Sequence, residues 1–433
     1  MQQTTKSLIK LNFSYKKDVK YLLGERIKHY RKAKKLTLSQ LAGQQMTKGM
    51  LSLIENNKAN PSLENLEYIA SQLDVSLSDL LSGEQASELR NLLLRLEKEL
   101  TIEVYEDKDQ LKTWIEEIKP FLSMVEHTYE YARMLELYAI CLFYSQEDNY
   151  HEYFKKSANL YHELNMTTKE LSIRVGMIST LFIEKKYEES YIEIKKLMTN
   201  LDYLYSHVEP LSKLEISFHH AAFSFALGKL EEGFEVIDQA LKLSAEEQIY
   251  YYIGEMYRLA ASTQILFQEK KYSPYLDKLR LYGQFSEDFQ SILATEVLEN
   301  CLLFNDGKYK ESYIHAVQQI ARLNASKQLD TTYEHTVSYT IYLQFFTALK
   351  GRSLYYLNSI SEAMEALQSV TIPKITNYPL DINALYLSKY YLAKCYLKIN
   401  NVDKAKQVID ESLNVLKDFP YSPTRELFLQ LSL

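Results

Sequence analysis

Seven segments of this 433-residue sequence repeat one layout, and that layout restricts the fold more than any other feature of the chain. In the clearest copy, KLEEGFEVIDQALKL (229–243), the apolar Leu230 is followed by a small residue three positions later, Gly233, and by another ten positions later, Ala240. These spacings place the three residues on one face of a helix, where small side chains let a second helix pack closely. Looser copies have their anchor residues at Tyr150, Tyr187, Tyr272, Tyr309, Ile360 and Val402. The pattern predicts a stack of helical pairs in which neighbouring pairs bury each other's apolar sides.

The repeated layout resembles the second helix of a tetratricopeptide (TPR) unit. Successive anchors lie 37 to 51 residues apart, which exceeds the usual TPR repeat of about 34 residues, so longer loops or helices are expected. The whole chain has only 11 Gly and 8 Pro, and this favours long helices over many strands and turns. The resemblance implies an all-α fold in which residues 126–433 form a right-handed TPR superhelix of about seven helix pairs around a concave channel.

Polar residues on the first helix of each pair are candidates for binding a peptide in that channel. Amide side chains suit an extended peptide because one Asn can both donate and accept a hydrogen bond, and an Arg can hold a C-terminal carboxylate through two hydrogen bonds. Taken singly, each candidate is explained more simply by a solvated or inter-helix hydrogen bond. As a group they suggest a peptide site, with Asn300 as the first candidate. Counting back from the anchors selects Arg258, Gln264, Gln268, Asn300, Asn305, Arg352, Tyr355 and Tyr390, with Thr295 and Lys394 beside them.

Charge is distributed unevenly along the chain. The net charge is −7, yet residues 1–83 carry 13 Lys and Arg against 7 Asp and Glu, whereas the remainder carries 37 against 50. A basic N-terminal part on an acidic body is expected when only that part meets a polyanion such as nucleic acid.

Five short helical patterns follow one another between residues 19 and 83. The first places Ile27 on its apolar side and Arg31 among the basic residues on the opposite side. Thr37 is the expected N-cap of the second helix, and Gln40 completes a capping box. A cramped polar joint then leads to the third helix.

Thr47 is the expected N-cap of this third helix, for which Met50, Leu51 and Ile54 form the predicted buried side. Two helices joined by so tight a turn indicate a helix-turn-helix.

These motifs resemble the repressor-type (Xre/Cro-like) DNA-binding domain over its full length. The segments RI-x-x-x-R, LT-x-x-x-LA, S-x-IE, NPS and V-S-L fall in the family's order, although the joint between the second and third helices is one residue shorter than the commonest form. The resemblance implies that the third helix enters the major groove of DNA. Leu53 stands where relatives usually carry a basic residue, and Asn57 replaces the usual helix-ending Gly. A helical domain used only for dimerisation is the alternative.

The third helix must show small polar groups at its N-terminal turn, where base edges are nearest. Other polar residues around it can hold backbone phosphates, which fix the register without identifying bases. The predicted DNA-contacting residues are Lys35, Thr37, Thr47, Lys48, Gly49, Ser52, Asn57 and Lys58.

The predicted boundaries are an N-terminal extension over 1–18, the helix-turn-helix domain over 19–83, linker helices over 84–125 and the TPR-like domain over 126–433. The linker contains a leucine stripe that includes Leu89, Leu93 and Leu96, which could pack within the chain or against a symmetry mate.

Several classes of protein are excluded or disfavoured. The three cysteines are far apart without a CxxC pair, which argues against disulfides or zinc and fits a reducing cytoplasm. The N-terminus lacks the apolar core of a signal peptide, and the longest apolar run, 336–349, is too short to span a bilayer. No catalytic or cofactor-binding fingerprint is present, so neither an enzyme nor a cofactor is expected. The adjacent pair His219 and His220 suggests a packing or channel role rather than a metal site.

The combination of the two parts resembles the RNPP family of peptide-responsive transcriptional regulators, with the layout of its PlcR- and NprR-like branches. The resemblance implies a cytoplasmic quorum-sensing regulator that binds a double-stranded DNA operator and a short, re-imported signalling peptide, and that forms a homodimer through its body. The alternative is a TPR protein that sequesters a regulatory protein partner, such as a response regulator, with DNA binding secondary.

Overall fold

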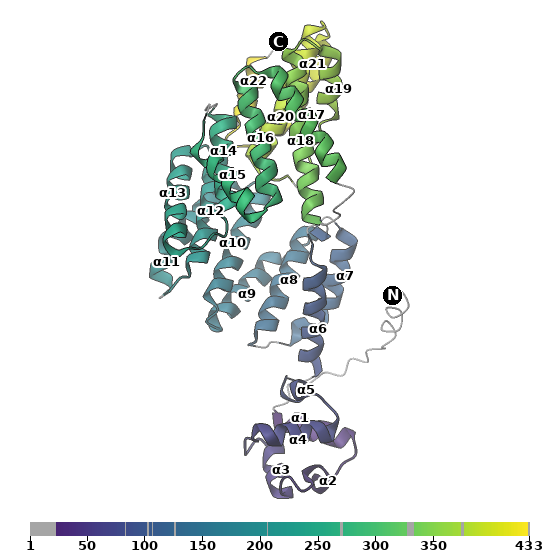
Figure 1. The fold of residues 1–433 in the computed structure, drawn as a ribbon. Helices are drawn as coiled ribbons and strands as arrows, with labels where there is room; N and C mark the ends of the chain where they lie inside the picture. Colours follow the sequence, from purple (N-terminus) through teal and green to yellow (C-terminus); the bar gives the residue numbers. More distant parts are fainter. Residues whose placement is uncertain are drawn as a thin grey trace. The chain divides into compact units, whose positions relative to one another are not determined.

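The computed structural model describes residues 23–82, 84–101, 104–105, 107–124, 127–205, 207–268, 272–326, 333–373 and 376–431. Over these residues the regular secondary structure is entirely helical (Figure 1). The chain divides into two compact units, residues 1–100 and 101–433. The predicted extension over 1–18 lies outside the described residues.

The first unit is a set of short helices around one apolar core. The core contains Ile27, Leu41, Leu51, Ile54 and Ile69, all of them almost completely buried. Met50 is 40% exposed, so its predicted burial was wrong. The buried apolar side of the third helix consists of Leu51 and Ile54 alone. The helices are α1 (Leu23–Ala33), α2 (Leu38–Ala42), α3 (Lys48–Glu55), α4 (Leu63–Leu73), α5 (Leu77–Ser82) and α6 (Glu84–Glu99).

The segment expected to be a linker does not stand apart from the two units. Its first helix, α6, belongs to the first unit and packs on α5. Its second helix, α7 (Lys108–Ile118), belongs to the second unit and buries Trp114 completely. The boundaries at residues 83 and 125 stay predictions.

The second unit is an array of antiparallel helix pairs. The pairs are α8 (Tyr129–Ser145) with α9 (Tyr150–Glu163), α10 (Thr167–Ile183) with α11 (Tyr187–Leu204), α12 (Pro210–Ala226) with α13 (Leu230–Glu247), α14 (Ile253–Ser262) with α15 (Pro274–Ser286), α16 (Phe289–Asn305) with α17 (Tyr309–Ser326), α18 (Tyr333–Tyr356) with α19 (Ile360–Ser369), and α20 (Pro379–Lys398) with α21 (Val402–Leu416). The π-helical turn η3 (Thr263–Phe267) extends α14, the 3₁₀ turn η2 (Lys119–Ser123) follows α7, and α22 (Pro423–Gln430) ends the array.

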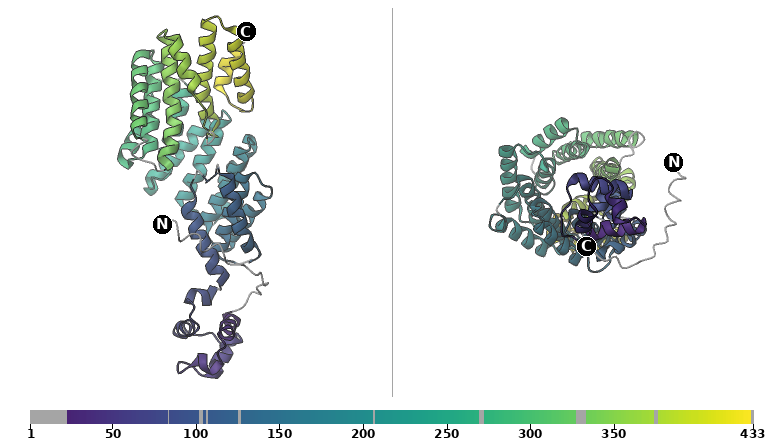
Figure 2. Two further views of the ribbon diagram at one scale, coloured as in Figure 1. Left: turned by 90° about the vertical axis from the view of Figure 1, so that its right-hand side faces the viewer. Right: turned by 90° about the horizontal axis from the view of Figure 1, so that it is seen from below.

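The repeated anchors mark where the second helix of each pair begins. Six of the seven are the first residue of that helix, and Tyr272 precedes Pro274 by two residues. The fold is therefore all-α, with a short-helix domain followed by a TPR-like array, as predicted. In Figure 2 the helices of the second unit follow a curved path.

The curve brings the last pair back onto earlier ones. The hydroxyl of Tyr378, ahead of α20, donates to the carbonyl of Ala222 in α12 at 3.0 Å. The Lys185 ammonium pairs with Asp418 at 2.8 Å, across 233 residues of sequence. These contacts join the residue before α20 to α12, and the turn after α21 to the turn after α10, so the two ends of this part of the array are held together.

Gly233, the small residue three positions after the anchor Leu230, permits close packing of α13 against α12. Gly233 is buried in α13, and a methyl group added there would overlap the aromatic ring of Phe225 in α12. Gly176 in α10 has open space around the same position.

We therefore expect Gly233→Ala to lower the free energy of unfolding of the second unit by about 1–3 kcal/mol, because the Phe225 ring must move. The matched control, Gly176→Ala, should be neutral or stabilising by up to about 1 kcal/mol, since Ala favours a helix interior over Gly. Urea unfolding followed by fluorescence of the single Trp, Trp114, measures both. Equal effects of the two substitutions would contradict the packing role of Gly233.

Candidate nucleic-acid interface and ligand channel

The N-terminal turn of α3 presents small polar groups on an apolar base. The Thr47 hydroxyl caps the helix by accepting the backbone N–H of Met50 at 3.1 Å. Lys48 and Gly49 are exposed and Ser52 is half-buried, while Leu51 is buried on the opposite side. This is the arrangement that a helix entering a major groove requires.

The capping box that starts α2 is present as predicted. Gln40 N–H donates to the Thr37 hydroxyl at 3.2 Å, and the Gln40 side chain accepts from Thr37 N–H at 2.8 Å. Thr37, Lys35 and Lys58 are all exposed. Their positions leave them accessible for phosphate contacts.

Asn57 has an internal role that the sequence did not indicate. It adopts the left-handed conformation, with φ of 55°, as expected of a residue standing in for Gly. Its Oδ1 also accepts the backbone N–H of Gly24 at 2.9 Å. Asn57 therefore ties the start of α1 to the end of α3, which satisfies one of the otherwise unpaired N–H groups of the helix.

Arg31, predicted among the basic residues on the side of α1 opposite Ile27, is not a surface cation. Its Nε and Nη2 donate to the two carboxylate oxygens of Glu55 at 2.6 and 2.9 Å, and its Nη1 donates to the carbonyl of Leu36 at 2.7 Å. The side chains are only 11% and 3% exposed. Hydrogen bonding to Glu55 raises the pKa of Arg31. The signal that could have identified this pair is an acidic residue directly beside the buried Ile54.

Arg258 lines a cavity of about 140 Å³ among the first helices α14, α16, α18 and α20. Two of its guanidinium nitrogens donate to Oε2 of Glu255 at 2.7 and 2.9 Å. Glu255 and then Asp381, which also lines the cavity, raise the pKa of Arg258, whereas burial opposes them. The positive charge of Arg258 is thus already balanced by neighbouring carboxylates.

Asn300 does not line the channel in this structure. The residue is completely buried, and its Oδ1 accepts a hydrogen bond from the Ser312 hydroxyl of α17 at 2.5 Å. Thr295 is also buried and donates to the carbonyl of Ser291 within α16. Asn300 therefore has the simpler role, an inter-helix hydrogen bond, because its side of α16 packs against α17, the second helix of the pair.

The remaining amide candidates are dispersed. Gln264 is buried, with 8% of its surface exposed, whereas Gln268 is exposed. The Asn305 side chain donates to the carbonyl of Ile265 at 3.3 Å, bridging α16 to the preceding pair.

Arg352, Tyr355 and Tyr390 do come together. The Arg352 guanidinium lies 4.3 Å from the ring centroid of Phe304 and 5.4 Å from that of Tyr391. The Lys394 ammonium lies 5.1 Å from the centroid of Tyr355 and 5.4 Å from that of Tyr390. Four of the channel candidates, including Lys394, therefore share one site on α18 and α20.

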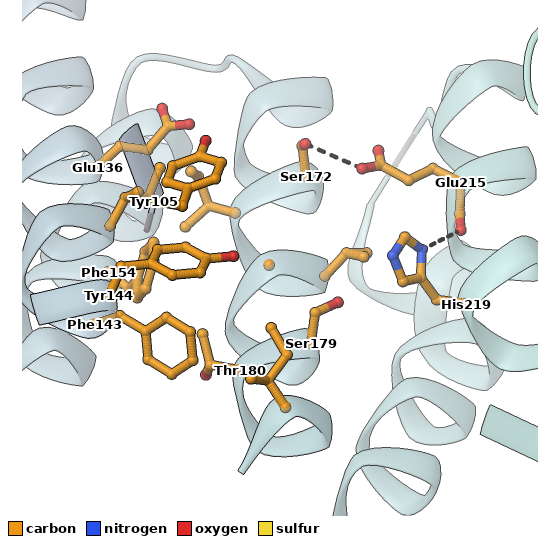
Figure 3. Close-up of a pocket in the computed structure, with 15 residues that line it drawn as sticks. Tyr105, Glu136, Phe143, Tyr144, Phe154, Ser172, Ser179, Thr180, Glu215 and His219 are labelled. Carbon is orange, nitrogen blue, oxygen red and sulfur yellow. Dashed lines mark hydrogen bonds between the residues drawn. The ribbon is translucent and has the colours of Figure 1, made fainter. Parts of the chain in front are cut away.

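A second cavity, of about 290 Å³, is formed mainly by the first helices α8, α10 and α12, together with Tyr105 and with Phe154 of α9 (Figure 3). Its walls combine aromatic rings, among them Phe143 and Tyr144, with the carboxylates of Glu136 and Glu215. The sequence did not identify this cavity, because most of its lining residues are ordinary apolar and hydroxyl side chains.

Glu215 and His219 define the polar wall of this cavity (Figure 3). Burial raises the pKa of Glu215, although Ser172 donates to its carboxylate at 3.2 Å. Burial lowers the pKa of His219, so the ring is neutral at pH 7, and its Nδ1 donates to the Glu215 carbonyl at 2.9 Å. Of the two histidines for which a packing or channel role was predicted, His219 lines this cavity, while His220 pairs with Glu232 at 3.1 Å.

Comparison with known proteins identifies a domain within the first unit. A family model described as a helix-turn-helix domain matches residues 24–86. Residues 24–86 are a helix-turn-helix domain. Two curated relatives, each an HTH-type transcriptional regulator SinR, from Bacillus licheniformis and from Bacillus subtilis (strain 168), are 44% identical over 69 residues. That alignment covers 16% of this chain and 62% of each relative, so the chain spans less than two thirds of their length.

Similar solved structures are more distant. PlcR of Bacillus thuringiensis, in complex with the peptide PapR7 and DNA, is 16% identical, with 61% of this chain and 95% of that chain covered at a TM-score of 0.34. ComR from S. thermophilus, in complex with DNA and its signalling peptide ComS, is 20% identical, with 66% and 100% covered at a TM-score of 0.29. Similarities this weak carry no argument about the function of the chain.

Within the part of the chain that the structure describes, no helix is long and apolar enough to cross a membrane. The same residues contain no group of three or more His, Cys, Asp or Glu side chains that could hold a metal ion.

Proposed function

We propose that this chain is a transcriptional regulator of the RNPP type, which binds operator DNA through α3 and a short signalling peptide in the channel of its helical array. The single observation that carries the DNA-binding part is the polar, exposed first turn of α3 on a buried Leu51–Ile54 base, within a helix-turn-helix domain. The excess of basic residues in 1–83 supports contact with phosphates.

The peptide part is supported by the two cavities on the first helices of the array. They combine aromatic surface with a few charged groups, which is the composition expected of a ligand site. A peptide can change DNA affinity only if it binds one arrangement of two DNA-binding domains more tightly than another. The proposal therefore includes a homodimer and an operator with two half-sites. A cytoplasmic location is also part of the proposal.

Footprinting on the DNA upstream of the chain's own gene tests the DNA-binding part. We expect protection of a pseudopalindrome whose half-sites lie about 10–10.5 base pairs apart, or a multiple of this, because a two-fold dimer meets the same face of the duplex at that spacing. Protein that binds all DNA alike at moderate salt would overturn the proposal.

Substitution in α3 gives the matching prediction. Lys48→Gln should weaken binding to the protected site by about tenfold or more, since a good base contact contributes about 1–3 kcal/mol. The control is Lys98→Gln, which removes the same charge from an exposed position on α6. Titration of labelled operator at fixed salt measures both, and an equal loss from the two substitutions would argue against contact by α3.

A further inference from the structure

Three cations gather among tyrosines on neighbouring first helices of the array. We define the cation–tyrosine cluster as Arg352 and Tyr355 of α18 with Tyr390, Tyr391, Lys394 and Lys398 of α20. Lys394 lies 5.1–5.4 Å from the ring centroids of Tyr355, Tyr390 and Tyr391. Lys398 lies 5.1 Å from Tyr355 and donates to Oδ1 of Asn358 at 2.8 Å.

The cluster carries positive charge that no carboxylate balances among the described residues. Arg352 and Lys394 have no ion pair there, and the buried Nε of Arg352 has no hydrogen-bond partner. A half-buried guanidinium with an unused N–H is costly unless a ligand supplies the acceptor. Arg258, in contrast, is already held by Glu255 and faces Asp381.

The cluster lies about two helical turns along α18 from the cavity beside Arg258. Phe345 lines that cavity, and Arg352 follows it by seven residues on α18. Seven residues are two helical turns, so the two side chains share a face and are about 10 Å apart along the helix axis. An extended peptide covers that distance with about three residues.

We propose that the cation–tyrosine cluster binds the C-terminal carboxylate of the peptide, with the last three residues of the peptide between the cluster and the Arg258 cavity. This rests on the proposed peptide-binding function. The Arg352 guanidinium holds the carboxylate through paired hydrogen bonds, Lys394 adds a second positive charge, and the tyrosine hydroxyls offer further donors. The acidic surroundings of Arg258 direct the carboxylate away from that residue.

The test uses the full-length protein and two pools of random heptapeptides, identical except that one has free C-termini and the other has C-terminal amides. Peptides that remain bound after gel filtration are quantified by mass spectrometry. We expect the free-acid pool to be retained at least tenfold better, and Arg352→Gln or Lys394→Gln to abolish that preference. Arg352→Lys should restore part of it, and Lys404→Gln, at an exposed lysine 5.7 Å from the ring of Tyr396, should leave it unchanged.

The outcomes separate this inference from the function on which it rests. Equal retention of the free-acid and amidated pools would overturn the carboxylate assignment and leave peptide binding intact. Retention that falls equally in both pools when Asp and Glu are omitted would assign the cluster to side-chain carboxylates and would also overturn the proposal. Retention of no peptide from any pool would overturn the peptide-binding function itself.

Discussion

Replacing Arg31 by methionine is expected to lower the free energy of unfolding of the helix-turn-helix domain by about 3–5 kcal/mol, because the Glu55 carboxylate is left buried without a partner. Glu55 is 3% exposed and receives two hydrogen bonds from Arg31. The pair joins the end of α1 to the end of α3, so the substitution should also misplace α3. Hydrogen exchange of the backbone amides of α1 and α3 measures the loss directly, since Trp114 belongs to the other unit.

The control for this prediction is Lys34→Met, one turn away. Lys34 pairs with Asp74 at 3.5 Å, but the two side chains are 41% and 93% exposed. An exposed pair contributes about 0–1 kcal/mol. If both substitutions reduced protection equally, the Arg31–Glu55 pair would have no special role. Addition of Glu55→Gln to Arg31→Met should recover part of the loss, because the unpaired charge is then removed.

Replacing Glu232 by glutamine should lower the free energy of unfolding of the second unit by about 2–3 kcal/mol at pH 7. The difference between the folded and unfolded pKa of Glu232 sets the upper limit of this effect. The Glu232 carboxylate accepts from Lys195 Nζ and from the Tyr191 hydroxyl, both at 2.7 Å. Burial alone would raise the pKa of Glu232, but these hydrogen bonds outweigh it and lower the pKa from 4.5 to about 2.

The lowered pKa of Glu232 determines how this stabilisation depends on pH. A carboxyl group with a depressed pKa stabilises the folded state above its unfolded pKa, and this stabilisation is lost as the pH falls from about 4.5 towards 2. Urea unfolding followed by Trp114 fluorescence should therefore show a large difference between wild type and Glu232→Gln at pH 7 and a clearly smaller one near pH 3. Glu246→Gln, which breaks an exposed pair with Lys242 in the same helix, should change stability little at either pH. A difference for Glu232→Gln that does not depend on pH would contradict this explanation.

Much of the fold could be predicted because it depends on residues that are close together in the sequence. The hydroxyl caps Thr37 and Thr47 start helices through hydrogen bonds that span only three residues. The anchors of the repeats begin helices because an apolar residue at that point packs into the preceding helix of the same pair, as Tyr187 does against Phe182. Such signals need no knowledge of distant parts of the chain.

The candidate sites were less predictable, because they depend on contacts between helices. Helical periodicity shows which residues share a face, but not whether that face meets the channel or the partner helix. Asn300 therefore looks like a channel residue in the sequence and is fully buried against Ser312 in the structure. Arg31 looks like one of several surface cations until its distance to Glu55 is known. Arg352, Tyr355 and Tyr390 were accessible to prediction because counting back from the anchors Ile360 and Val402 selects positions on one side of adjacent first helices.

Selection from a library of random DNA duplexes tests the central claim, that α3 recognises specific bases, most directly. Full-length protein at physiological salt should enrich a motif of two related half-sites about one helical turn or a multiple of it apart. A variant carrying Lys48→Gln and Ser52→Ala, which leaves the Thr47 cap of α3 in place, should lose that enrichment while it retains its fold. Recovery of the input library unchanged by the wild-type protein would contradict the claim.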